Sequence, residues 1–193
     1  MPAPTIQMQI TEGPVLKDSP DFVIIPVFQE THEDETRIIW GPFLSELDVE
    51  LPFNLRQLLQ NEEYTGAHGQ SFYLPQVKDW PAVLLAGCGL ATKAATGRLE
   101  QAVHKALGAH ARRKRYENVR IGATQTAGSL DAESVLLALA GAIFQFSYRS
   151  RESRRPGPRV ERLTFCYRDS IPEEGASYLR RAGEALRGRY MTM

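Results

Sequence analysis

Apolar runs bounded by turn residues predict buried β-strands along the chain. The clearest run covers residues 22–28, contains several β-branched side chains and follows a turn signal at Asp18-Ser19-Pro20. Such a run favours a strand buried on both faces, although Pro26 cannot donate a hydrogen bond to a neighbouring strand. The polar, acidic stretch after it, residues 29–35, is predicted to be a loop. Similar criteria predict strands at residues 5–10, 71–74, 82–87, 119–122 and 160–167.

Apolar residues at helical spacing predict helices between these strands. In residues 96–115 they form one core-facing stripe, with Thr96 as the expected N-terminal cap and a basic cluster at the carboxyl end. Leu55, Leu58 and Leu59 fit a short helix, Asp131 is expected to cap another, and residues 172–189 predict a last, amphipathic one. The alternation of strands and helices indicates an α/β sandwich with a mixed, largely parallel sheet.

Length and composition indicate a folded chain rather than a disordered or membrane-spanning one. The 193 residues are 42% hydrophobic, and no apolar run approaches the ~20 residues of a membrane-spanning helix. We expect one domain over residues 1–193. Two cysteines cannot build a disulfide framework and the N-terminus shows no signal pattern, so the reducing cytoplasm is the expected compartment and a membrane is not an expected partner.

The net charge of zero hides an asymmetry between the two halves of the sequence. Residues 1–97 contain 13 acidic and 5 basic side chains, whereas residues 98–193 contain 10 acidic and 18 basic ones. This split is compatible with an acidic and a basic face, which would favour head-to-tail self-association, or with halves that interleave so that the charges mix. The mixed arrangement is favoured, because charge patterning informs association more than fold.

A glycine turn at the end of the 82–87 run is the candidate ligand site. Backbone amides at Gly87, Cys88, Gly89 and Leu90 could approach a phosphate there. However, the next predicted helix begins several residues later, without the Lys-Ser/Thr or third glycine of a phosphate loop, so a plain strand-end turn is favoured. Cys88 has no adjacent base to activate it as a nucleophile, and Cys166 is expected to fill the core.

The sequence shows no pattern typical of a catalytic or metal site. The four histidines lack metal-ligand spacing, the acidic runs are typical of solvated loops, and neither a nucleophile elbow nor a Walker loop occurs. We therefore assign no catalytic residue, no metal ligand and no cofactor to this chain.

Two arginine-rich segments are the candidate contacts for an anion or a nucleic acid. Clustered arginines can neutralise phosphates, and binding of that kind weakens steeply with salt. A solvated face or a subunit contact is the favoured alternative. The candidate residues are Arg112, Arg113, Arg115, Arg151, Arg154 and Arg155.

Several segments, taken in order, resemble the N-terminal domain of the leucyl (cytosol) aminopeptidase family. Residues 21–28 resemble its early strand, residues 63–70 its aromatic-x-Gly-x-x-Gly stretch, and residues 83–89 its apolar strand ending in Gly-x-Gly. The helix over 96–115 and the strand over 119–122 follow in the expected order. Residues 140–149 are similar to the family's helix ending in Tyr-x-Phe-x-x-Tyr-Lys, and the resemblance extends from Phe22 to Arg187.

The resemblance implies a three-layer, macro-like α/β fold without catalytic machinery of its own. In this family the two metal ions and the catalytic residues lie in a C-terminal domain, whose Asn-Thr-Asp-Ala-Glu-Gly-Arg stretch does not occur here. Residues 172–189 resemble the helix that connects to that domain. The family forms hexamers, and its N-terminal domains can serve regulation, assembly or, in some bacteria, DNA binding.

The expected function is therefore that of a non-catalytic N-terminal-type domain acting in assembly, regulation or protein association. Its expected partner is another protein or a second copy of the chain, and this chain alone is not expected to be an enzyme. Two alternatives stay open: a nucleotide- or ADP-ribose-binding module at residues 87–90, and a nucleic-acid-binding domain that uses the arginines. The Asn-rich segment and longer glycine loop of ADP-ribose-binding macrodomains are not found, which counts against the first alternative.

Overall fold

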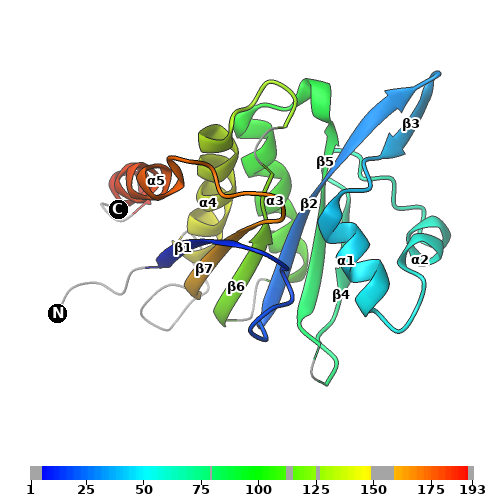
Figure 1. Ribbon diagram of the computed structural model, residues 1–193, viewed down its shortest axis with the longest axis horizontal. Helices are drawn as coiled ribbons and strands as arrows, with labels where there is room; N and C mark the ends of the chain where they lie inside the picture. The colour runs from blue at the N-terminus through cyan, green and yellow to red at the C-terminus, as the bar shows by residue number, and fades with distance from the viewer. Residues whose placement is uncertain (1–5, 79, 112–114, 125–126, 149–158, 191–193) are drawn as a thin grey trace.

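A computed structural model describes residues 6–78, 80–111, 115–124, 127–148 and 159–190, and shows a β-sheet with helices on both faces (Figure 1). The described strands are β1 (Gln7–Glu12), β2 (Phe22–His32), β3 (Glu35–Ile38), β4 (Ser71–Leu74), β5 (Ala82–Leu90), β6 (Tyr116–Gly122) and β7 (Val160–Tyr167). The described helices are α1 (Pro42–Glu50), α2 (Leu55–Asn61), α3 (Thr96–His110), α4 (Ala132–Tyr148), α5 (Gly175–Tyr190) and the short 3₁₀ helix η1 (Ala91–Lys93). None of the helices in this part of the chain has the length and hydrophobicity that crossing a bilayer requires.

The sheet is mixed but mostly parallel, with the strand order β1-β7-β6-β2-β5-β4. The first five of these strands run parallel to one another, and β4 is antiparallel to β5 at one edge. β3 lies off this path and pairs antiparallel with the last residues of β2. The predicted α/β class with a mixed, largely parallel sheet is therefore confirmed.

The two faces of the sheet carry separate hydrophobic cores. In β2, Phe22 and Ile24 face the core beneath α3, α4 and α5, whereas Val23 and Ile25 face the core beneath α1 and α2. This alternation is that of a strand buried on both faces, as the continuous apolar run predicted. Pro26 does not prevent it, because β2 pairs with β6 only over Phe22–Ile24 and Pro26 lies beyond that ladder.

The prediction of a loop over residues 29–35 is wrong. β2 continues to His32 and turns through Glu33 and Asp34 into β3, so that a hairpin projects from the body of the molecule (Figure 1). Both turn residues have positive φ values, 48° and 65°, which are typical of the central residues of a type I′ hairpin. The usual signal for that turn is Asn-Gly or Asp-Gly, and Glu-Asp does not carry it.

The starts of two helices also differ from the sequence predictions. α1 was not predicted, because its nine residues are too few to show a clear helical period. α3 includes Thr96 as a helical residue; its N-cap is Ala95, and no side chain caps the helix, so the expected Thr96 cap is wrong. The last helix begins at Gly175 rather than at Pro172.

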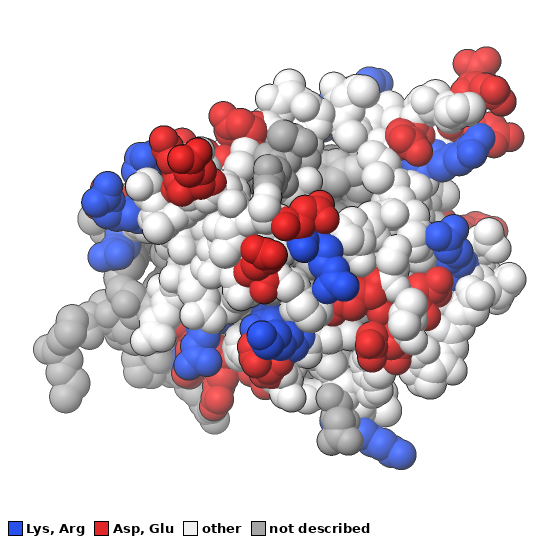
Figure 2. Space-filling model, viewed as in Figure 1, with Lys and Arg blue, Asp and Glu red and all other residues white. Residues whose placement is uncertain are grey.

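The strands of the two halves of the sequence lie largely at opposite ends of the strand order. β2, β5 and β4 come from the first half and β6 and β7 from the second, with β1 alone crossing over. The β2–β3 hairpin and α5 therefore lie at opposite ends of the molecule (Figure 1). Acidic side chains gather at the hairpin tip, whereas basic and acidic side chains lie next to one another at the α5 end (Figure 2). The strand order thus separates the two halves of the sequence, whereas acidic and basic side chains lie close together over most of the face that Figure 2 shows.

Candidate functional site

A cavity of about 680 Å³ opens at the carboxyl ends of β2, β6 and β7. Parallel α/β sheets commonly bind ligands at this edge, because the loops that follow neighbouring strands converge there. The volume lies within the roughly 300–1,000 Å³ typical of small-molecule sites. Besides β2, the described lining comes from the β3–α1 connection, the start of α1, α4, the last residues of β6 and β7, and the segments that follow β5, β6 and β7.

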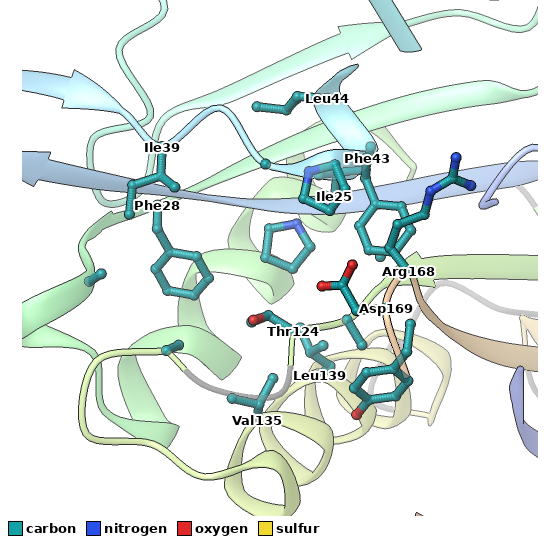
Figure 3. Close-up of a pocket in the computed structure, with 18 of the residues that line it drawn as sticks. Ile25, Phe28, Ile39, Phe43, Leu44, Thr124, Val135, Leu139, Arg168 and Asp169 are labelled. Carbon is teal, nitrogen blue, oxygen red and sulfur yellow. The ribbon is translucent and has the colours of Figure 1, made fainter. Parts of the chain in front are cut away.

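Apolar side chains from β2 and the start of α1 form one wall of this cavity (Figure 3). β2 supplies Ile25 and Phe28, and the first turn of α1 supplies Phe43 and Leu44. Phe43 packs against the backbone of Gly122, where an added β-carbon would stand 2.6 Å from the ring. The absence of a side chain at the end of β6 therefore allows Phe43 to close this wall.

The first turns of α4 form the opposite wall with Val135 and Leu139, both of which are buried. The start of α4 is fixed by Asp131, whose Oδ1 accepts a hydrogen bond from the Ser134 amide at 2.8 Å. Hydrogen bonds from the Ser134 amide and hydroxyl lower the pKa of Asp131. The predicted Asp131 cap is thus confirmed, and it positions the apolar residues of the wall.

Charged groups enter the cavity from the segment that follows β7. The Asp169 carboxylate points into the cavity in Figure 3, and among the described residues it makes no hydrogen bond and no ion pair. The guanidinium of Arg168 points away from the centre and lies 4.0 Å from the Glu46 carboxylate. That carboxylate also accepts hydrogen bonds from the amides of residues 15 and 16, at 3.2 and 3.0 Å. The charge that faces the interior is therefore negative.

Residues 87–90, the candidate phosphate-binding turn, do not line the cavity; Ala91, immediately after them, does. The Gly87 amide donates a hydrogen bond to the Gln70 carbonyl at 2.9 Å, and the Gly89 amide donates one to the Gly66 carbonyl at 3.0 Å. A β-carbon at Gly87 would overlap the Ala67 carbonyl oxygen. The two glycines thus hold the segment before β4 against the end of β5, and their amides already have acceptors.

Neither cysteine is placed to act as a nucleophile. Both are free and buried, and burial raises the pKa of Cys88 to about 12 and that of Cys166 to about 11. At neutral pH both groups are thiols, whereas the thiolate is the reactive form. Cys166 lies in the core beneath α1 and α2, as expected, and Cys88 lies in the core on the other face of the sheet.

Most of the arginines singled out in the sequence, namely Arg112, Arg113, Arg151, Arg154 and Arg155, lie outside the described residues. Arg115 is described; it is exposed and has an interaction partner. Arg120, close to the first segment, is buried and has a structural role: its guanidinium lies 2.6 Å from Asp18 and donates a hydrogen bond to the Pro14 carbonyl at 3.0 Å.

Within the described residues, no three or more His, Cys, Asp or Glu side chains are grouped so that they could hold a metal ion. His110 stacks on Tyr73, with ring centroids 5.2 Å apart, and lies 2.9 Å from the Ser71 hydroxyl. Burial lowers the pKa of His110, which favours its neutral form. These contacts place the His110 ring against β4.

The model of the cytosol aminopeptidase family, N-terminal domain, matches residues 24–156. The chain belongs to this family. The resemblance found in the sequence is therefore confirmed, and the match is to the N-terminal domain of the family. No curated protein sequence matches the chain at a significant level.

Solved structures show the same fold in larger enzymes. A mutant of tomato leucine aminopeptidase matches 96% of this chain with a TM-score of 0.69 and 21% sequence identity, and the match takes up 37% of that chain. The bottromycin maturation enzyme BotP in complex with Mn matches 88% of this chain with a TM-score of 0.50 and 17% identity, over 31% of its own length. At these identities the likeness shows the fold alone, and this chain spans only a part of either enzyme.

Proposed function

We propose that this chain acts as a non-catalytic domain of the cytosol aminopeptidase family, in assembly or regulation through contact with protein. The family model that this chain matches is that of the N-terminal domain. The chain's match to the tomato leucine aminopeptidase structure takes up 37% of that longer chain. The observation that carries the proposal is the acidic tip of the β2–β3 hairpin, which projects from the body of the molecule and supplies a charged surface for association.

The charge of the hairpin tip and of α5 favours a second copy of this chain as the partner. The hairpin tip is acidic, and α5 itself carries four exposed arginines and one glutamate, so the tip of one copy is attracted to α5 of another when they approach head to tail. A contact of this kind is heterologous and closes into a ring or continues as a filament. The exposed charged residues of the hairpin are Glu30, Glu33, Asp34, Glu35 and Arg37, and those of α5 are Arg180, Arg181, Glu184, Arg187 and Arg189.

Neutralising the hairpin tip is expected to weaken self-association about tenfold at low ionic strength, the effect of roughly 1.4 kcal/mol from three lost charges. The variant combines Glu33→Gln, Asp34→Asn and Glu35→Gln, which keep side-chain size at an exposed turn. Sedimentation velocity over a concentration series, at low and at high salt, measures the association constant. High salt is also expected to weaken the self-association of the unmodified chain, because it screens exposed charges.

The matched control neutralises two acidic residues in and just before α5, with Glu173→Gln and Glu184→Gln, both at exposed positions. This change makes the α5 end more positive, so the association is expected to stay the same or to become stronger. A chain that remains monomeric at all concentrations and salt levels would contradict the proposal. So would an oligomer that the hairpin variant leaves unchanged.

A further inference from the structure

We propose that the cavity at the carboxyl ends of β2, β6 and β7 binds a small organic cation, an amine with an apolar body, with Asp169 as its counter-ion. This inference goes beyond the association proposed above and is independent of it. The cavity belongs to this chain's own described residues, and its volume of about 680 Å³ is that of a small-molecule site.

The walls fit an apolar body. Ile25, Leu44, Val135 and Leu139 are buried aliphatic side chains that line the cavity. The rings of Phe28 and Phe43 lie along it from two different elements, as Figure 3 shows. Aliphatic and aromatic walls stabilise a ligand by burying its apolar surface. An aromatic face also attracts a cation directly.

The charge fits an ammonium group rather than an anion. The Asp169 carboxylate points into the cavity and lacks an ion-pair partner among the described residues, whereas the Arg168 guanidinium points away toward Glu46. A bound phosphate or carboxylate would therefore face a like charge at the mouth. An ammonium would instead donate a charge-assisted hydrogen bond to the Asp169 carboxylate.

Among the described residues, this edge of the sheet offers little else that would select a phosphate. The amides of Gly87 and Gly89 are the candidates that the sequence suggests for that role. They donate hydrogen bonds to the carbonyls of Gln70 and Gly66. They also lie outside the lining of the cavity. The described lining thus combines extended apolar walls with the side chains of Thr124 and Ser170 and with the exposed Asp169 carboxylate, whose charge favours an amine over an anion.

Three probes of matched shape test the proposal on the unmodified chain: 2-phenylethylamine, 2-phenylethanol and phenylacetate. Their binding is followed by ¹H–¹⁵N correlation spectra, using the backbone amides of Gly122, Ala123, Thr124 and Ser170 as reporters of the lining. The amine is expected to bind with a dissociation constant on the order of 1 mM, as its roughly nine heavy atoms allow. The alcohol is expected to bind about tenfold more weakly, and the carboxylate more weakly still.

Asp169→Asn is expected to weaken amine binding about tenfold and to leave alcohol binding unchanged, because only the ion pair is lost. Glu117→Gln, at an exposed position near the start of β6, away from the carboxyl end where the cavity opens, is the matched control and is expected to change neither. The proposal is overturned if phenylacetate binds as tightly as the amine, if the shifts map away from the cavity, if no probe shifts these amides, or if Asp169→Asn binds the amine unchanged. The three-probe comparison decides the matter even if a variant fails to fold.

Discussion

Gly87→Ala is expected to lower the free energy of unfolding by about 3 kcal/mol, through steric overlap and strained hydrogen bonds. The new β-carbon would overlap the Ala67 carbonyl oxygen and stand 3.0 Å from both the Gln70 carbonyl oxygen and the Gly66 carbonyl carbon. All three are backbone atoms, so no side chain can rotate away to relieve the overlap. The hydrogen bond from the Gly87 amide to Gln70 would have to shift as well. Urea denaturation followed by circular dichroism measures the loss.

Gly97→Ala is the matched control, because an added β-carbon there meets nothing within 4 Å. Gly97 lies in α3, where alanine is the better helix former, so the change is expected to be neutral or stabilising by up to about 1 kcal/mol. If both glycine variants were equally stable, the close approach of the 66–70 segment to β5 would not be a constraint on the fold.

Phe22→Ala is expected to lower the free energy of unfolding by about 3–5 kcal/mol, a large part of the 5–15 kcal/mol typical of a folded domain. Phe22 is 1% exposed in β2, the strand that joins the two sides of the sheet. Its ring stacks on Tyr116 with centroids 4.6 Å apart, and meets the edge of Tyr73 at 6.4 Å. Removing it would leave a cavity between β2, β6 and β4, which urea denaturation reports as a lower midpoint.

A Phe→Ala substitution at an exposed position shows how much of the cost at Phe22 comes from lost core packing rather than from the loss of an aromatic side chain. Phe53→Ala, at a phenylalanine that is 42% exposed, is expected to cost less than about 1 kcal/mol. Phe22→Leu keeps most of the volume and is expected to retain most of the stability. A cost at Phe22 no larger than that at Phe53 would contradict the placement of Phe22 in the core.

The regular parts of the fold could be predicted because their signals are local. The runs at β2 and β5 are apolar and partly β-branched, and they are buried on both faces as such runs favour. The hairpin and α1 could not be predicted, because their local sequence signals are weak. Gln29 looks like a loop residue, yet its side-chain amide is buried and donates to the Thr65 carbonyl at 2.9 Å, a partner 36 positions away.

The candidate site was harder to predict, because its walls come from segments far apart in the sequence. Phe28, Phe43 and Asp169 meet only when β2, β6 and β7 align their carboxyl ends. One signal was available: Thr124 and Asp169 follow closely after two predicted strands, at the edge where parallel sheets bind ligands. The sequence instead indicated the turn at residues 87–90 as the candidate ligand site, but its glycines form hydrogen bonds with the 66–70 segment.

The most direct test of whether this chain works by association alone is an assay of leucine release from leucine amide. The purified 193-residue chain is incubated with the substrate and Mn²⁺ or Zn²⁺, and free leucine is measured over time. We predict no release above the metal-containing blank. Sustained release that is proportional to the chain concentration, and that a chelator abolishes, would contradict a non-catalytic role.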